Sequence, residues 1–336
     1  MTKFCNILFM KDFIGLAPVV IALLFCFVLH VSVGAKYLPM TSVYEALIDR
    51  DPGNFHHMII WDLRLPRALI AIAVGAALSV SGALMQGVTR NPLAEPGILG
   101  LLSGASFAVV VATHIFGPYS PIALPWIAAL GALGAASIVY TVARSAPGGI
   151  TPLTLTLSGA ILTALMGAII SVLHLLDQDS FDNLRIWLSG SLSARRPGVL
   201  VATGPVLLLA LAMAFGLARQ VTALSMGDDL ATGLGVPTGR LKFILLVIVV
   251  SLSACAVALA GPLVFIGLII PHAVRMIVGS DYRWIVPYSA LVGAIYLLII
   301  DIIARVLLAP QEISTGILTA MIGAPLFIQL VRNKAR

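Results

Sequence analysis

Charged side chains are scarce in this sequence. Asp, Glu, Lys and Arg make up 10% of the 336 residues, whereas an average soluble domain has about a quarter. Apolar residues make up 60%, and the mean hydropathy is +1.07. This balance excludes a large soluble core and indicates a membrane protein. Since no stretch is long and polar enough for a separate soluble domain, we expect residues 1–336 to form a single transmembrane domain.

Cysteine is also rare, and its spacing excludes several chemistries. Cys5, Cys26 and Cys255 form no C-x-x-C pair, which argues against a disulfide framework, a structural zinc site and a thiol active site. The sequence has no G-x-x-x-x-G-K-[ST] motif, so the chain carries no nucleotide site of its own. No catalytic constellation stands out. We therefore expect a protein that is not an enzyme and that binds no metal or cofactor.

Apolar runs long enough to cross a bilayer follow one another along the whole chain. Since a crossing takes about 20 apolar residues, roughly ten crossings fit, and we expect an all-α polytopic bundle. Around Gly261 and Pro262 two runs meet almost without a polar break, and a hairpin or broken helix is expected there. The expected spans are 13–33, 66–88, 97–116, 122–143, 153–175, 198–218, 241–260, 262–278, 285–308 and 315–331.

Small residues interrupt several of these runs, among them Gly75, Gly82, Gly131 and Gly134. In lipid, close contact between helix backbones replaces the hydrophobic drive for packing, and small side chains permit that contact. We interpret these glycines as positions where helices approach one another closely within the bundle.

The formal net charge is +6, but the basic residues form no block of like charge, and no nucleic-acid surface is expected. With the N-terminus inside, 12 of the 20 basic residues fall in inner segments and 8 in outer segments. This bias predicts cytoplasmic N- and C-termini. It also leaves outer arginines, Arg64, Arg67 and Arg305 among them, that need an explanation.

Two charged residues, Asp301 and Arg305, fall within an apolar run. They are four residues apart, on one face of the expected helix, where they can form an ion pair. Burying either charge alone in the membrane is expensive, so we expect them to neutralise each other. A proton relay needs a chain of such groups through the bundle, and the sequence offers only this pair near one end.

The longest inner polar segment covers residues 219–242. Asp228 and Asp229 begin a short expected helix that glycine ends, and a second helical turn is expected from Pro237. Because apolar side chains stand among the charges, we interpret the segment as a handle for a cytoplasmic partner. A plain connecting loop is the alternative.

Several groups of residues, spread over nearly the whole chain, form a recognisable pattern. They are Arg64-Leu65-Pro66-Arg67, Gln86 with Asn91–Gly100, Met226-Gly227-Asp228 with Leu234-Gly235-Val236, Gly261–Leu268 with Pro271, His272 and Arg275, Asp301–Arg305, and Gly323–Phe327. Together they resemble the FecCD-type permeases, which serve ABC importers of ferric siderophores, haem and cobalamin.

This resemblance implies a ten-helix permease of the type II ABC importers in the bacterial inner membrane. Its partners would be a second permease subunit, identical or paralogous, two cytoplasmic ATPases that bind ATP and Mg, and a periplasmic substrate-binding protein. Residues 89–93 and 103–107 look closest to siderophore permeases. We therefore expect a ferric siderophore as cargo, with haem or cobalamin as alternatives.

The resemblance also implies roles for individual residues. Arg64, Arg67 and Arg305 match positions that receive acidic residues of the binding protein; alternatively, Arg64 and Arg67 anchor a helix end and Arg305 only neutralises Asp301. The cytoplasmic gate would lie at Ile150, Thr151 and Pro152, although Thr151 is the only hydroxyl residue in the stretch 147–153. The ATPase-coupling positions would be Gly227, Asp228, Asp229, Ala231, Leu234, Gly235 and Val236.

Two other function classes compete with this reading. An ion-coupled secondary transporter of ten helices would show several buried carboxylates or a sodium site in broken helices. An intramembrane enzyme would show clusters of His, Asp and Glu at mid-membrane depth. Neither pattern is found in the sequence.

Overall fold

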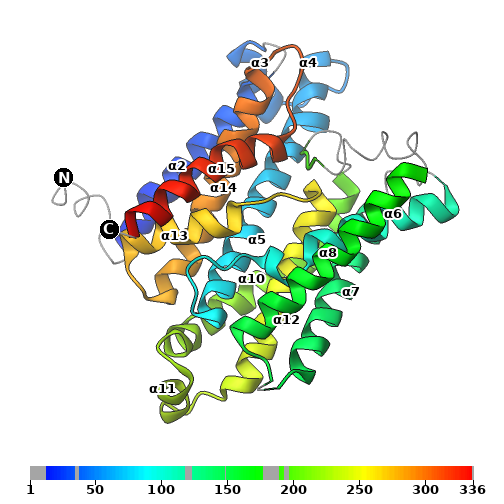
Figure 1. The fold of residues 1–336 in the computed structure, drawn as a ribbon. Helices are drawn as coiled ribbons and strands as arrows, with labels where there is room; N and C mark the ends of the chain where they lie inside the picture. Colours follow the sequence, from blue (N-terminus) through cyan, green and yellow to red (C-terminus); the bar gives the residue numbers. More distant parts are fainter. Residues whose placement is uncertain are drawn as a thin grey trace.

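The computed structural model describes residues 13–34, 38–117, 123–147, 149–176, 189–192 and 197–334. All regular elements within these ranges are helical (Figure 1). Seven helices are long and apolar enough to cross a membrane, and three shorter apolar helices accompany them. The expected all-α polytopic bundle of ten apolar helices is confirmed.

The helices follow the predicted spans closely over most of the chain. Residues 38–64 add short helices that hydropathy did not predict, since they are too short to form a span. The elements are α2 (Phe13–Ser32), α3 (Met40–Ile48), α4 (Phe55–Met58), η1 (Ile59–Arg64), α5 (Leu65–Thr89), η2 (Pro96–Leu99), α6 (Leu101–Phe116), α7 (Leu124–Ser145), α8 (Pro152–Leu176), α10 (Pro197–Ser225), α11 (Asp228–Gly233), α12 (Thr238–Ala260), α13 (Ile266–Val278), α14 (Tyr282–Val306) and α15 (Thr315–Lys334).

The boundaries of the inner segment 219–242 were predicted wrongly. Helix α10 continues to Ser225, well past the expected end at 218, and α12 begins at Thr238. Polar residues end the apolar run there without ending the helix, because hydropathy reports the membrane boundary and not the backbone hydrogen bonds. The turn expected from Pro237 is therefore the first turn of α12 itself.

Helix α5 lies at the centre of the bundle, and every residue from Val74 to Thr89 is buried. Helices α10, α12, α13 and α14 pack around it. A Cβ on Gly75 would overlap the backbone of Gly293 in α14, and one on Gly82 would overlap Gly267 in α13. The close helix contacts predicted for both glycines are confirmed, and they let α13 and α14 approach α5 closely.

The two glycines of α7 behave differently from each other. Gly131 lies against the backbone of Gly104 in α6, as expected, whereas a Cβ on Gly134 would meet no atom within 4 Å. The close approach predicted at Gly134 was wrong. The glycines are three positions apart, so they point in directions about 60° apart around the helix, and only one faces the neighbour.

The break expected around Gly261 is confirmed. Helix α12 ends at Ala260 and α13 begins at Ile266. Gly261, directly after α12, has φ +75°, and Phe265, directly before α13, has φ +69°, positive values that interrupt the regular helix. The Glu95 carboxylate accepts a 2.9 Å hydrogen bond from the Phe265 backbone N–H, and so satisfies one donor that the break exposes.

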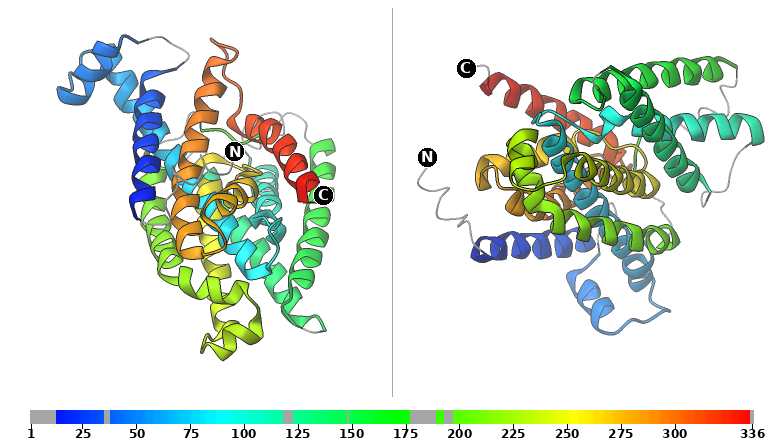
Figure 2. Two further views of the ribbon diagram at one scale, coloured as in Figure 1. Left: turned by 90° about the vertical axis from the view of Figure 1, so that its left-hand side faces the viewer. Right: turned by 90° about the horizontal axis from the view of Figure 1, so that it is seen from below.

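The bundle has two clearly different ends (Figures 1 and 2). Helices α3 and α4 lie at one end and α11 lies at the opposite end, in Figure 1 and in the left view of Figure 2. We refer to them as the α3–α4 end and the α11 end. The predicted docking arginines lie at the first, and the predicted coupling residues lie at the second.

Candidate functional site

A fully buried carboxylate, Asp301, organises the α3–α4 end. Arg67 donates two hydrogen bonds to it, from Nε to Oδ2 at 2.8 Å and from Nη2 to Oδ1 at 3.0 Å. Thr315 Oγ1 donates to Oδ1 at 2.9 Å. His30 Nε2 and Arg305 Nε lie 2.9 and 3.3 Å from Oδ2. One carboxylate therefore joins side chains from α2, α5, α14 and α15.

The predicted pair of Asp301 and Arg305 is present, but Arg67 binds the Asp301 carboxylate with better hydrogen-bond geometry than Arg305 does. Its planar fork meets the carboxylate through two short bonds, the arrangement that gives charge-assisted hydrogen bonds their strength. Sequence reasoning missed the bonds that His30, Arg67 and Thr315 make to Asp301. A signal was available in the order of the crossings. Alternating crossings place the ends of spans one and nine at the same side of the membrane as the starts of spans two and ten. His30 and Asp301 lie near the first two ends, and Arg67 and Thr315 lie at the two starts.

Arg64 and Arg305 turn inward. Arg64 is 5% exposed and its Nη1 donates to the carbonyls of Val31, at 2.9 Å, and Ser32. Arg305 is 3% exposed, and its Nη2 donates to the His30 carbonyl at 3.1 Å. Both cations thus bind carbonyls of the last turn of α2, which carries partial negative charge. These bonds fasten the end of α2, and both the docking role of the two residues and the anchoring of a helix end at headgroup level stay predictions.

Arg67 connects this buried network to the surface. Its Nη1 lies 2.8 Å from Oε2 of Glu312, in the segment between α14 and α15. The Arg67 side chain is 12% exposed and that of Glu312 is 32% exposed. Of the three predicted docking arginines, Arg67 is therefore the one whose guanidinium is paired with a partly solvated carboxylate.

At the α11 end, the predicted coupling residues form one exposed turn. Ala231 is fully buried against the bundle, whereas Leu230 and Leu234 are 61% and 68% exposed. The two leucines are four residues apart and so lie on the same side of the turn. Gly227 and Gly235 flank it with φ values of +128° and +79°, conformations that glycine adopts without steric cost. The short helix ended by glycine is confirmed.

Asp228 holds this turn on the bundle. Lys242 Nζ of α12 lies 2.6 Å from its Oδ2, and Arg90 Nη2, at the end of α5, lies 3.9 Å away. Neighbouring Asp229 is exposed to solvent. The coupling residues are thus linked directly to two of the central helices, and their role in coupling stays a prediction.

A second polar group at the α11 end begins α14. Asp281 accepts hydrogen bonds from the Arg283 backbone N–H at 2.9 Å and from Thr222 Oγ1 of α10 at 3.2 Å. Thr222 Oγ1 in turn accepts from the Tyr282 N–H at 2.9 Å. The Arg283 guanidinium, hydrogen-bonded to the carboxylate, holds the pKa of Asp281 below its ordinary value.

The predicted gate residues lie where α8 begins. Thr151 N donates to Thr154 Oγ1 at 2.8 Å, and Thr154 N donates to Thr151 Oγ1 at 3.1 Å. This reciprocal pair resembles a capping box and precedes a helix whose first residue is Pro152, a favoured residue there. The two hydroxyls are 3.1 Å apart. Ile150 is half-buried beside them, and the gating role stays a prediction.

Within the described ranges, no group of three His, Cys, Asp or Glu side chains could hold a metal ion. Asp301 is the only acidic residue among the described ones that is buried, and it is surrounded by donors rather than by further carboxylates. The polar groups of the described part therefore fasten helices together and present one exposed turn.

Comparison with known proteins gives matches along nearly the whole chain. The siderophore transport system permease protein YfiZ of Bacillus subtilis is 44% identical, with 88% of each chain covered. The ferric enterobactin permease FepD of Escherichia coli is 40% identical over 96% of each chain. The hemin permease HmuU of Yersinia pestis is 40% identical over 81% of this chain and 83% of its own.

The fold is matched as well. A solved metal-chelate type ABC transporter in an inward-facing conformation superposes with a TM-score of 0.83 and 33% identity, covering 95% of this chain and 98% of that one. The family model described as the FecCD transport family matches residues 22–333. This range includes both ends of the bundle described above, and the chain belongs to the FecCD transport family.

Proposed function

We propose that this chain is the permease subunit of an ATP-driven importer that carries a ferric siderophore across the bacterial inner membrane into the cytoplasm. The observation that carries this proposal is the end-to-end match to relatives named as siderophore and enterobactin permeases. Relatives named for hemin and ferric citrate are similar to a comparable degree, so these two cargoes are the alternatives. Cobalamin remains the third cargo that the family likeness suggests.

The exposed turn at the α11 end supports coupling to a separate ATPase. Two leucines on one side of a short helix are the kind of anchor that enters a groove on a partner protein. Because Asp228 binds Lys242 of α12, a push on α11 would reach the centre of the bundle directly. ATP and Mg would be bound by two partner ATPases, and this chain would bind neither.

The α3–α4 end would then face the periplasm, with both termini cytoplasmic. A periplasmic binding protein would dock there through carboxylates that reach the Arg67–Glu312 pair. Arg64 and Arg305 would support this surface from beneath, since their guanidinium groups already donate to α2 carbonyls. A second permease subunit, identical or paralogous, would complete the transport path between the two subunits within the membrane lipid.

The main rival is an ion-coupled secondary transporter. Such a protein would carry protonatable groups along its path. The buried carboxylate of Asp301 has five donor atoms within 3.3 Å and lies at one end of the bundle. A carboxylate so fully paired is a poor proton carrier, which favours the ATP-driven importer.

The proposal is tested by reconstituting the complex that co-purifies with the full chain into proteoliposomes and supplying the binding protein outside. Uptake of ⁵⁵Fe is measured from ferric enterobactin, a ferric hydroxamate and ferric citrate, and uptake of hemin by its absorbance. We expect uptake of one siderophore with ATP inside and none with a non-hydrolysable analogue. Uptake that needs no ATP and that stops when the proton gradient is collapsed would contradict the proposal.

A further inference from the structure

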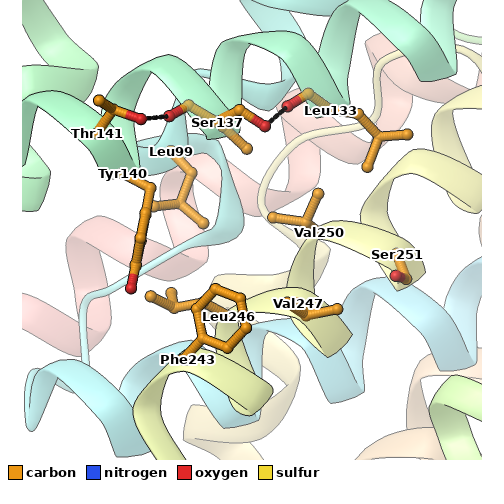
Figure 3. A pocket seen from close by; sticks show the side chains of 11 residues that line it. Leu99, Leu133, Ser137, Tyr140, Thr141, Phe243, Leu246, Val247, Val250 and Ser251 are labelled. Carbon is orange, nitrogen blue, oxygen red and sulfur yellow. Dashed lines mark hydrogen bonds between the residues drawn. The ribbon is translucent and has the colours of Figure 1, made fainter. Parts of the chain in front are cut away.

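A groove of about 290 Å³ lies between α7 and α12 (Figure 3). Leu133 and Tyr140 line it from α7, and Phe243 and Val247 from α12. Leu133, Phe243 and Val247 are 40%, 50% and 48% exposed, so the groove is open along its length at the side of the bundle. Since α7 and α12 are both membrane-crossing helices, the groove opens toward the bilayer.

The walls of the groove are mainly apolar, and two of the four hydroxyl groups that line it are hydrogen-bonded within α7. Ser137 Oγ donates to the Leu133 carbonyl and Thr141 Oγ1 to the Ser137 carbonyl, each at 2.8 Å. These bonds return the hydroxyls to their own helix. At the end nearest α11, the rings of Tyr140 and Phe243 pack edge to face, with centroids 5.6 Å apart. Such a surface suits a hydrocarbon chain rather than a water-soluble ligand.

Two arginines extend the walls of the groove by one helical turn. Arg144 follows Tyr140 by four residues on α7, and Arg240 precedes Phe243 by three on α12, so each lies on the groove-facing side of its helix. Both are exposed. Because α7 ends at Ser145 and α12 begins at Thr238, both charges stand at the same mouth, at the α11 end.

Neither arginine has a partner among the described residues. Hydrogen bonds and ion pairs are formed there by Arg90, Lys242 and Arg283, but none by Arg144 or Arg240. The mouth therefore offers two positive charges, neither paired with a described residue, above an apolar groove. This combination complements a molecule with an anionic head and a hydrocarbon tail.

The length of the groove matches one leaflet. Residues 133–141 of α7 rise about 12 Å along the helix axis, and half of a bilayer hydrocarbon core is about 15 Å. An acyl chain lying in the groove would thus place its phosphate close to the level of the two arginines.

We propose that this groove is a binding site for an anionic phospholipid from the leaflet at the α11 end. The acyl chain lies between α7 and α12, and the phosphate binds Arg144 and Arg240. The groove is open to the membrane, where lipid is always at hand. A protein partner would instead have to supply an apolar ridge and acidic groups at the same spacing. Because α12 also carries Lys242, the lipid would brace the helix that holds α11.

The test uses native mass spectrometry of the full chain with the subunits that co-purify, titrated with phosphatidylglycerol or phosphatidylcholine. We expect tighter binding of phosphatidylglycerol, and about thirtyfold weaker binding by the Arg144→Gln/Arg240→Gln variant. The variant Arg219→Gln is the charge control, because Arg219 is exposed on α10 and does not line the groove. Equal affinity of the wild type and the double variant for phosphatidylglycerol would overturn the proposal.

A second variant tests the groove itself. Val247→Trp fills the groove from an exposed position and leaves both arginines in place, and Val201→Trp adds the same side chain at a position of α10 that is 75% exposed. We expect Val247→Trp to lower phosphatidylglycerol occupancy at least fivefold and Val201→Trp to leave it unchanged. If the two tryptophan variants bind this lipid equally well, the acyl chain does not lie between α7 and α12 and the proposal is wrong.

Discussion

The two ends of the bundle use their few charges in opposite ways. At the α3–α4 end, Asp301 and its partners are buried and turned toward one another, and they fasten the ends of four helices. At the α11 end, Asp228 and Lys242 fix a short turn from below while Leu230 and Leu234 point into solvent. The buried network stabilises the packing of the helices at the first end, whereas the second end exposes an apolar surface that another protein can bind.

This difference shows what exposure means in a membrane protein. An exposed leucine at membrane depth needs no explanation, because lipid covers it. Leu230 and Leu234 belong to a segment outside the membrane-crossing helices, where water would surround them. Exposed apolar side chains in water, arranged on one face, are typical of a surface that binds another protein.

The largest expected effect comes from breaking the network at the α3–α4 end. Asp301→Asn keeps the shape of the side chain but leaves Arg67 and Arg305 buried without their shared anion. We expect the free energy of unfolding to fall by about 3–5 kcal/mol, because an unpaired buried charge is far costlier than the lost pair. Thermal denaturation of the purified chain in detergent measures this loss.

The matched control is Asp62→Asn. Asp62 pairs with Arg50 at 3.2 Å, but both side chains are about half exposed, and such a surface pair contributes about 0–1 kcal/mol. If both variants lose the same stability, the network around Asp301 is no more important than a surface ion pair, and the contrast between the two ends disappears.

A smaller effect is expected where the network reaches the surface. The Glu312 carboxylate forms an ion pair with the Arg67 guanidinium, so a carboxylate of the docking partner must compete with it for Arg67. Removing this competitor in Glu312→Gln should strengthen binding of the periplasmic protein about two- to fivefold, the range of an exposed ion pair. Surface plasmon resonance on the complex in nanodiscs gives the affinity. Glu45→Gln in α3, also exposed, is the control, and equal affinities for both variants would argue against docking at Arg67.

The smallest effect concerns Asp281 at the α11 end. Arg283 lowers the pKa of this carboxyl in the folded chain, so its charge adds stability above the ordinary pKa of 3.8. That contribution is lost as the pH falls through the lower folded value. Asp281→Asn keeps a capping side chain and removes only the charge. We expect it to cost about 0.5 kcal/mol at pH 7, and a melting-temperature difference that shrinks below pH 4.

The sequence predicted those features that depend on neighbouring residues. Apolar runs predicted the crossings, the spacing of Asp301 and Arg305 predicted their pairing, and Asp228 with Gly233 and Gly235 predicted the short helix α11. Each of these signals lies within a few turns of one helix. The C-terminal end of helix α10 was missed because hydropathy marks only where the apolar run ends. The backbone hydrogen bonds of the helix continue beyond that point to Ser225.

Features that join distant segments were not predicted, although the alternation of crossings places the segments around Asp301 at the same end of the bundle. Arg67 is 234 positions from Asp301, and His30 is 271 positions away. Nothing local distinguishes His30 from the other single histidines in apolar runs. Only the order in which the helices pack decides that these side chains meet. The groove could not be predicted for the same reason. Its two walls come from α7 and α12, and nothing in the sequence of either helix indicates that the two lie side by side.

We propose that the exposed leucines of α11 bind the ATPase, and a comparison of two double variants tests this proposal. Leu230→Ser/Leu234→Ser is compared with Leu307→Ser/Leu308→Ser, which removes two similarly exposed leucines, 59% and 58%, at the opposite end. We expect both variants to keep the wild-type melting temperature, and only the first to lose the co-purifying ATPase and ATP-dependent ⁵⁵Fe uptake. If the α11 variant retains the ATPase as fully as the control does, the account is wrong.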